Sequence, residues 1–154
     1  MEAFPHRYRV RGAGQIAGDI ELTGDRLPTL PSASPVQFDG PGDRWSPETL
    51  LVGAVADCFL LTFRSIARAS NLSWTSIDCD VVGTLDQIDR VTQFTHFDLR
   101  ARLALPQGGD PSQSRRVLEK AERNCLIANS LKASVDLECS IDVAEPIEMA
   151  VASS

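Results

Sequence analysis

The chain has 154 residues, of which 43% are apolar and 23% charged, and its net charge is −6. This length predicts one domain, residues 1–154, and the ordinary composition excludes a disordered, collagen-like or low-complexity protein. Because a net negative surface repels phosphate groups, we expect neither a nucleic-acid partner nor a membrane partner.

The first 46 residues are rich in Gly and Pro, which separate three short strand candidates: 7–11, 19–23 and 35–38. The N-terminus lacks the apolar segment and cleavage site of a secretory signal. The longest apolar run, residues 50–63, is shorter than the roughly 20 residues that span a bilayer. We therefore expect a cytoplasmic protein, in which cysteines stay reduced.

A long helix is predicted to begin after Ser46, which can cap it, with Pro47 at the first helical position and Glu48 in the first turn. It should run to about Ser70. Its apolar residues occupy nearly every side, and a helix of that kind is buried on every side. Because one chain of this size has few layers to surround it, we infer that a second copy covers it in a homodimer.

Three later segments alternate apolar and polar residues with period two, which is typical of a half-buried antiparallel sheet: 77–81, 97–105 and 135–143. Residues 86–90 are predicted to turn between the first two strands. Asp110 and Pro111 open a second helix, which breaks around Asn124 and Cys125 before a short helical piece. This order of elements predicts an α+β fold.

The four cysteines separate into two kinds. The strand alternation places Cys79 and Cys139 on apolar faces, where a thiol acts as a small hydrophobe. Cys125 falls at the helix break, where backbone N–H groups and the helix dipole are expected to lower its pKa. Cys58 lies in mid-helix and would need a nearby Arg to become a thiolate, so a buried core thiol remains an alternative for it.

Metal binding and cofactors are not predicted. The sequence has no Cys-x-x-Cys pair, and its only histidines are His6 and His96. His96 alternates with charged residues on the polar face of its strand. A hydrolase or acyl transferase would need one of these two residues as a general base, and the sequence gives that function the least support.

Two segments resemble the cysteine motifs of the OsmC/Ohr family, which comprises osmotically inducible protein C and organic hydroperoxide resistance proteins. Residues 46–58 read SPETLLVGAVADC, and residues 121–131 read AERNCLIANSL. The family has Asn or Ser before Pro-Glu and ends the first motif in Ala-Cys. Its second motif is Ala-x-x-x-Cys-Pro-Val-Ser-x-x-Leu. The resemblance covers about residues 18–143, and residues 144–154 form an acidic tail of small residues.

The resemblance implies an intertwined α+β homodimer, with antiparallel sheets around a long buried helix and active sites at the interface. It also implies a thiol-dependent peroxidase that reduces organic hydroperoxides or hydrogen peroxide. In that scheme Cys58 attacks the O–O bond and becomes a sulfenic acid, and Cys125 resolves it as a disulfide. A dithiol of the dihydrolipoamide type or small thiols would restore the pair. Glu48 matches the residue that orients an activating Arg.

The activating Arg itself is missing. Gln37 stands at the position of the OsmC-type Arg, and the Ohr-type position, residues 12–15, also lacks one. Arg44 and Arg26 lie in the same region, and Arg44 completes the predicted site with Cys58, Cys125 and Glu48. The missing Arg leaves an alternative function open, namely an OsmC-like dimer that binds ligands or senses redox state without robust peroxidase activity.

Overall fold

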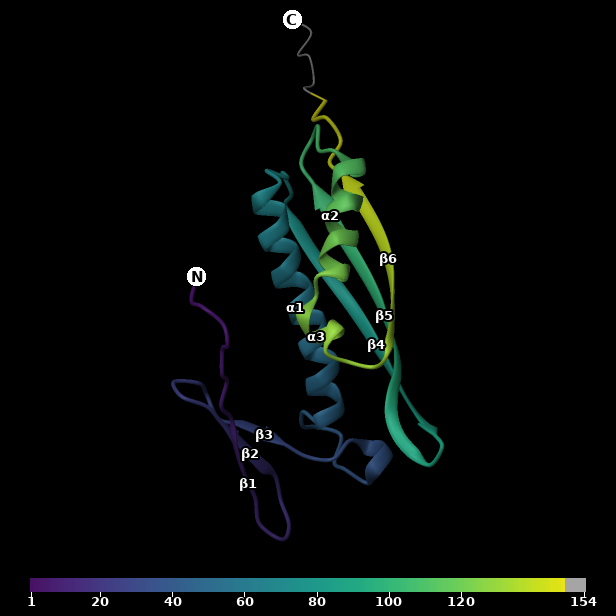
Figure 1. Ribbon diagram of the computed structural model, residues 1–154. Coiled ribbons are helices and arrows are strands. Elements are labelled where there is room, and N and C mark those ends of the chain that lie inside the picture. The colour runs from purple at the N-terminus through teal and green to yellow at the C-terminus, as the bar shows by residue number, and fades with distance from the viewer. Residues whose placement is uncertain (149–154) are drawn as a thin grey trace, which may run out of the picture. The chain divides into compact units, whose positions relative to one another are not determined.

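The computed structural model describes residues 1–148, which divide into two compact units at Leu51 and Val52. The expectation of a single domain over residues 1–154 stays a prediction. Part of the acidic tail, residues 149–154, lies outside the described residues. Figure 1 shows the order of the elements along the chain.

The first unit contains a small antiparallel sheet. Its strands β1 (Arg11–Ala13), β2 (Ile20–Thr23) and β3 (Leu30–Ser32) are ordered β1-β2-β3. The candidate at 19–23 is confirmed by β2, whereas the candidate at 7–11 is wrong because β1 begins only at Arg11. Sequence reasoning missed β3, whose Pro31 lies in an edge strand, where a missing N–H costs no ladder bond.

The strand candidate at 35–38 is also wrong. Val36–Phe38 form a 3-10 helix, η1, because the N–H groups of Phe38 and Asp39 donate back to the carbonyls of Pro35 and Val36. Asp39 then takes a left-handed conformation with φ 60°. The turn is closed at Gly40, where any Cβ would collide with the Ser34 carbonyl. A tight reversal therefore replaces the extended chain.

The long helix α1 (Pro47–Ala69) has almost the predicted limits. Ser46 Oγ accepts a hydrogen bond from the Thr49 N–H at 3.1 Å, and Thr49 Oγ1 accepts one from the Ser46 N–H at 2.8 Å. This reciprocal pair satisfies donors that a helix start leaves free. By length and composition alone α1 could cross a membrane, a test that the core helix of a soluble protein also passes.

The second unit is built on a sheet of three long strands, β4 (Ser76–Ile88), β5 (Val91–Leu105) and β6 (Ser134–Val143), with β5 in the centre. All three predicted strands are confirmed. The pairing of β4 with β5 is antiparallel, through a turn at Asp89 and Arg90, but β5 and β6 are parallel, which corrects the all-antiparallel expectation. Two helices connect β5 to β6, and such a crossover returns the chain in the same direction.

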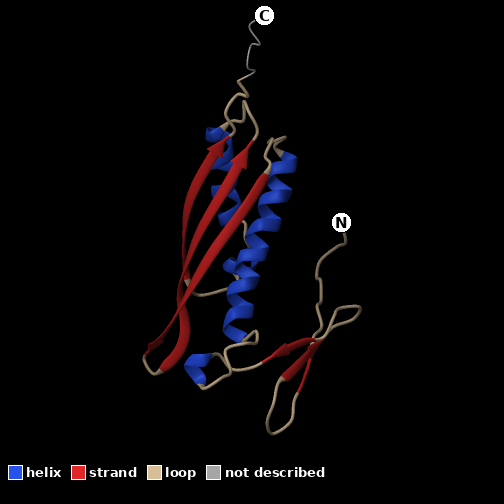
Figure 2. Ribbon diagram, turned by 180° about the vertical axis from the view of Figure 1, so that it is seen from behind, coloured by secondary structure: helices blue, strands red, loops and turns tan. Residues whose placement is uncertain are grey.

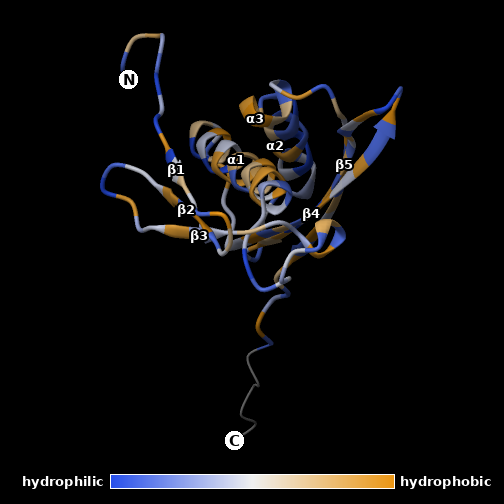
Figure 3. Cartoon of the chain, turned by 90° about the horizontal axis from the view of Figure 1, so that it is seen from below, coloured by the Kyte–Doolittle hydropathy of each residue, from blue (hydrophilic) through white to orange (hydrophobic). Residues whose placement is uncertain are grey.

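Helices cover one face of this sheet. Figure 2 shows the strands in front of the helices, and Figure 3 shows α1, α2 and α3 on the same side of β4 and β5. At Gly83 of β4 the helix comes so close that a Cβ would lie 2.8 Å from Val52 Cγ2. Any larger residue at position 83 would force the Val52 or Phe94 side chain to shift, so glycine favours close contact between α1 and the sheet.

The core of the second unit lies between this sheet and the helices. Its largest fully buried apolar side chains come from α1, β5 and α2: Val55, Phe59, Phe63, Phe97, Leu99, Leu103, Leu105 and Leu118. Within α1 the buried positions Val55, Phe59, Phe63 and Ala67 are spaced by four, so a single stripe faces the core. The sequence predicts that α1 is buried on every side. Within the described residues of this chain, only one side of α1 is buried.

Candidate active site

Cys58 lies in the middle of α1, on the flank of the buried stripe. Its two neighbours in the sequence differ in burial: Asp57 is exposed and Phe59 is fully buried. Cys58 itself is half-buried and is a free thiol. Its sulfur lies 4.0 Å from Thr62 Oγ1, one helical turn further along. The thiol is therefore accessible and held on a rigid element.

Cys125 is brought to the same place by the two helices that connect β5 to β6. Helix α2 (Pro111–Arg123) begins as predicted, with the Asp110 side chain accepting from the Gln113 N–H at 3.0 Å. The chain breaks at Asn124 and continues as the short helix α3 (Leu126–Asn129), whose N-cap is Cys125. This confirms the predicted break.

Cys125 is almost completely buried, with 1% of its surface exposed. Its sulfur lies 4.0 Å from the Val55 carbonyl oxygen of α1, one turn before Cys58. The Cys58 thiol is close enough to act on the ionisation of Cys125. The structure therefore brings together the two cysteines that the sequence motifs single out, with Cys58 on the open side and Cys125 behind it.

The pKa of Cys125 contradicts the sequence-based expectation. Its pKa is raised to about 11, chiefly because burial disfavours the thiolate, and the neighbouring Cys58 acts in the same direction. The backbone N–H groups of Ile127 and Ala128 act in the expected direction and lower it, but they do not offset the loss of solvation. Cys125 is therefore held as a neutral thiol, and the helix end does not make it the nucleophile.

A hollow of about 580 Å³ opens beside Cys58. Its walls come from α1, α2 and α3 and are largely apolar: Ala54, Leu61, Ile66, Leu126 and Ile127, with Asp57, Thr62, Ser65, Lys120 and Asn124 as the polar members. Leu61 and Leu126 keep 52% and 65% of their surfaces exposed. A small apolar molecule that enters the hollow would lie against the Cys58 thiol.

Lys120 is a site residue that sequence reasoning missed. It lies in the last turn of α2 and, among the described residues that line the hollow, it carries the only positive charge. Asp57 contributes a negative charge to the same walls. The signal in the sequence is that Lys120 lies five residues before Cys125, close to one helical turn from the break.

Two further predicted site residues, Glu48 and Arg44, belong to the first unit. Arg44 Nε lies 2.9 Å from Asp19 Oδ2 and its Nη1 lies 3.3 Å from Asp43 Oδ2, and this pairing raises the pKa of Arg44. Its guanidinium is thus engaged within its own unit. Glu48 Oε2 is buried and has no hydrogen-bond donor among the described residues. The role of both residues beside Cys58 stays a prediction.

The other two cysteines face inward from the sheet, as predicted. Cys79 and Cys139 are both half-buried and pair in register with Ala101 from its two sides. Burial raises the pKa of Cys79 to about 12, and it also raises the pKa of Cys139. Neither thiol lines the hollow beside Cys58. Both therefore act as packing residues.

Comparison with known proteins assigns the chain to a family. The model of the OsmC-like protein family matches residues 40–140, which contain both Cys58 and Cys125. The chain belongs to this family. It is 26% identical over 114 residues to the uncharacterised protein YmaD of Bacillus subtilis, covering 71% of this chain and 75% of that protein.

Peroxiredoxin OsmC of Escherichia coli is 30% identical over 93 residues, which cover 60% of this chain and 64% of the peroxiredoxin's length. Among solved structures, an OsmC-like protein of unknown function from Vibrio cholerae matches with a TM-score of 0.82 at 19% identity. That match covers 88% of this chain and 100% of the other, and it shows that the α+β fold is OsmC-like. The chain thus shares a redox-related family with a peroxiredoxin.

Proposed function

We propose that this protein is a thiol-dependent peroxidase that reduces organic hydroperoxides or hydrogen peroxide, with Cys58 as the nucleophile. The observation that carries the proposal is the pairing of a half-exposed thiol on the wall of a hollow, Cys58, with a buried thiol directly behind it, Cys125. Peroxide can reach the first thiol but not the second. The two roles follow from this difference in access.

The reaction proceeds in three balanced steps. The Cys58 thiolate attacks the distal oxygen of ROOH, the O–O bond breaks, and the leaving alkoxide takes up a proton to give ROH while Cys58 becomes a sulfenic acid. The Cys125 sulfur then displaces the hydroxyl, which leaves as water, and a disulfide forms. A dithiol reductant donates two electrons and two protons to restore both thiols.

The walls of the hollow supply what the first step needs. Leu61, Leu126 and Ile127 offer apolar surface to the organic group of a hydroperoxide. Lys120 places a positive charge on the same walls, where it favours the thiolate and the developing alkoxide. In this proposal Lys120 partly replaces the activating Arg of family members. Gln37 stands at the position of that Arg in this sequence.

We also propose that the working form is a homodimer. Support comes from α1, where most apolar residues outside the single buried stripe keep solvent-accessible surface within the chain. Support also comes from Glu48, whose buried Oε2 has no hydrogen-bond donor in residues 1–148, so that a partner could supply one. Light scattering at micromolar concentration should give twice the chain mass, and a stable monomer would contradict this proposal. A cytoplasmic location stays a prediction.

The test of the proposed activity is direct. Purified protein is mixed with cumene hydroperoxide and a dithiol reductant, and peroxide consumption is followed over time. We expect many turnovers per chain, and no consumption above the rate of the dithiol alone would overturn the proposal. Thiols that stay unreacted under these conditions would favour the alternative, an OsmC-like protein that binds ligands in the same hollow.

A further inference from the structure

The outward face of the sheet, opposite the helices, is patterned with charges that match across strands. Asp78 pairs in register with Arg102, and Asp80 with Arg100, which in turn pairs with Glu138 of β6. Arg102 Nε lies 3.4 Å from Asp78 Oδ1, and Arg100 Nε lies 3.5 Å from Glu138 Oε2. Opposite charges at facing positions stabilise strand pairing.

One pair breaks this pattern. Asp98 of β5 is in register with Asp136 of β6, so two carboxylates face each other on the same side of the sheet. The neighbour of Asp98 on the other strand is Val82, which supplies no charge. In the described part of the chain no Lys or Arg forms an ion pair with either aspartate; the partner of both is His96. Like charges at facing positions are destabilising unless a cation lies between them.

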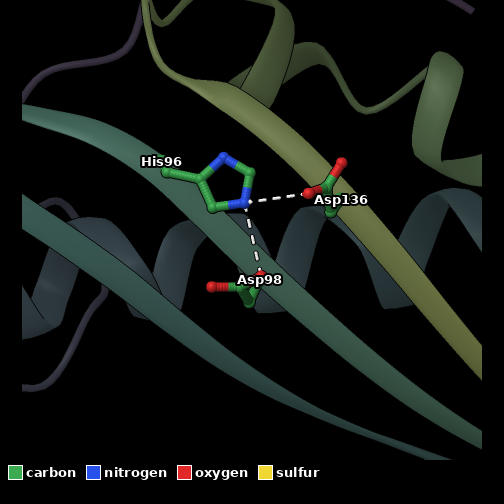
Figure 4. Close-up of side chains that lie close together, drawn as sticks. All are labelled: His96, Asp98 and Asp136. Atoms are coloured by element: carbon green, nitrogen blue, oxygen red, sulfur yellow. Dashed lines mark hydrogen bonds and ion pairs between the residues drawn. The ribbon is translucent and has the colours of Figure 1, made fainter.

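His96 is oriented toward this pair. Its Nε2 lies 3.3 Å from Asp98 Oδ1 and 3.2 Å from Asp136 Oδ2, as Figure 4 shows. Its Nδ1 lies 2.6 Å from Ser134 Oγ, and that hydroxyl donates to the Thr95 carbonyl at 3.4 Å. In the neutral tautomer that carries its proton on Nδ1, His96 donates this N–H to Ser134 Oγ, and the lone pair of Nε2 faces the two carboxylates.

We propose that His96, Asp98 and Asp136 bind one divalent transition-metal ion of the zinc type. Bond lengths of about 2.0–2.2 Å place neighbouring ligand atoms of a tetrahedral zinc site about 3.3–3.5 Å apart. The two distances from Nε2 nearly match this spacing, and all three ligand atoms lie within 4.8 Å of one another. One nitrogen and two carboxylate oxygens suit zinc and its neighbours in the transition series.

The surroundings also fit such a site. A histidine that binds a metal through one nitrogen usually donates the proton of the other to a fixed acceptor, which is the part Ser134 plays here. The side chains of Asp98 and Asp136 are 51% and 82% exposed, so an ion can enter and water can complete its coordination. A bound ion would neutralise the facing carboxylates and tie β5 to β6. This inference does not rest on the peroxidase proposal.

The test is a calorimetric titration of ZnCl2 into tag-free, metal-free protein at pH 8, where protons compete least for imidazole nitrogen. The same titration is made with His96→Ala, with His6→Ala as the matched histidine control, and with Cys58→Ser to remove the accessible thiol. We expect one saturable site per chain, unchanged in His6→Ala and Cys58→Ser and weakened at least about tenfold in His96→Ala. Absence of a saturable site, or a site lost with Cys58→Ser and kept with His96→Ala, overturns the proposal.

A second variant guards against a folding defect at His96. Asp136→Asn changes a side chain that is 82% exposed, and Asp80→Asn is its control on the same face. Without metal, Asp136→Asn should leave the melting temperature unchanged or raise it, because the like-charge contact is removed. With excess zinc, the rise in melting temperature seen for the wild type and Asp80→Asn should be absent in Asp136→Asn. An equal rise in all three proteins contradicts the site.

Discussion

The two regions of this protein that hold cysteine pairs use the same residue type for opposite purposes. Between α1 and α3, Cys58 opens on a hollow and Cys125 lies buried behind it. On the inner face of the sheet, Cys79 and Cys139 flank Ala101 on neighbouring strands. Cys79 and Cys139 are separated by two strand spacings of about 4.8 Å each. Their Cα atoms are therefore farther apart than the roughly 7 Å that a disulfide can bridge without backbone movement.

The difference shows that neither proximity nor burial alone makes a redox pair. Burial raises the pKa of Cys125 and of Cys79 alike, to about 11 and about 12. What distinguishes the helix pair is that one partner can be reached from solvent while the other can be reached only by its neighbour. A thiol with a positive charge nearby and a buried neighbour fits catalysis, whereas two inward-facing thiols on a sheet fit packing.

The largest effect should come from removing the accessible thiol. We expect Cys58→Ser to lower peroxide consumption by at least about 1,000-fold, because no other described cysteine lines the hollow. Cys79→Ser is the matched control and should keep the wild-type rate when stability is preserved. A Cys58→Ser protein with normal turnover would remove the distinction between the two pairs.

Loss of the buried partner should have a different signature. In Cys125→Ser the first reaction with peroxide should proceed, but Cys58 should stop as a sulfenic acid because its resolving thiol is gone. A sulfenic-acid trapping reagent should therefore label this variant after one equivalent of hydroperoxide and not label the wild type. Equal labelling of both proteins would show that Cys125 does not resolve Cys58.

A smaller effect is expected for Lys120. Replacing it with Met removes the positive charge on the hollow, and we expect the reaction of Cys58 with hydroperoxide to slow by about three- to tenfold. Because the lysine is exposed, added salt should reduce the difference. Lys132→Met changes the only other lysine of the chain, which does not line the hollow, and should have no effect. Equal rates for both variants would exclude a role for Lys120.

The smallest effect concerns the sheet pair and pH. The pKa of Cys79 is about 12 in the folded chain against an ordinary 9.0, and that of Cys139 is also raised. Above pH 9 the unfolded chain loses these thiol protons while the folded chain keeps them. The two thiols therefore contribute their full share to the free energy of unfolding below pH 9, and this share is lost as the pH rises toward 12. The urea concentration at the unfolding midpoint should decrease when the pH is raised from 8 to 10. In Cys79→Ala this decrease should be smaller by about 0.5 M. An identical fall in both proteins would contradict the burial of Cys79.

Much of the second unit could be predicted from its sequence because the signals are local. Ser46 with Pro47 and Asp110 with Pro111 fix both helix starts, and period-two alternation fixes three strands. The direction of β6 was missed because alternation says which face a residue takes but not which way the strand runs. In the first unit the strands have only three or four residues, so alternation of apolar and polar residues does not identify them reliably. The same short pattern predicts a strand where η1 forms.

The site was predictable in its cysteines but not in its electrostatics. The motifs located Cys58 and Cys125, yet the helix end at Cys125 suggested a lowered pKa where burial raises it. That result depends on how Cys125 packs beside Val55, which no local pattern shows. The spacing of Lys120 from Cys125 places it near the helix break, but it does not show that the side chain lines the hollow, which depends on how the helices pack.

The most direct test of the proposed redox pair, Cys58 and Cys125, is mass spectrometry of the reduced wild-type protein after one equivalent of cumene hydroperoxide. We predict a fast loss of two hydrogens per chain, and digestion without reductant should give a peptide pair joined through Cys58 and Cys125. A disulfide mapped to Cys79 and Cys139, or an unchanged mass with peroxide still present, would contradict the claim that the pair between α1 and α3 is the redox centre.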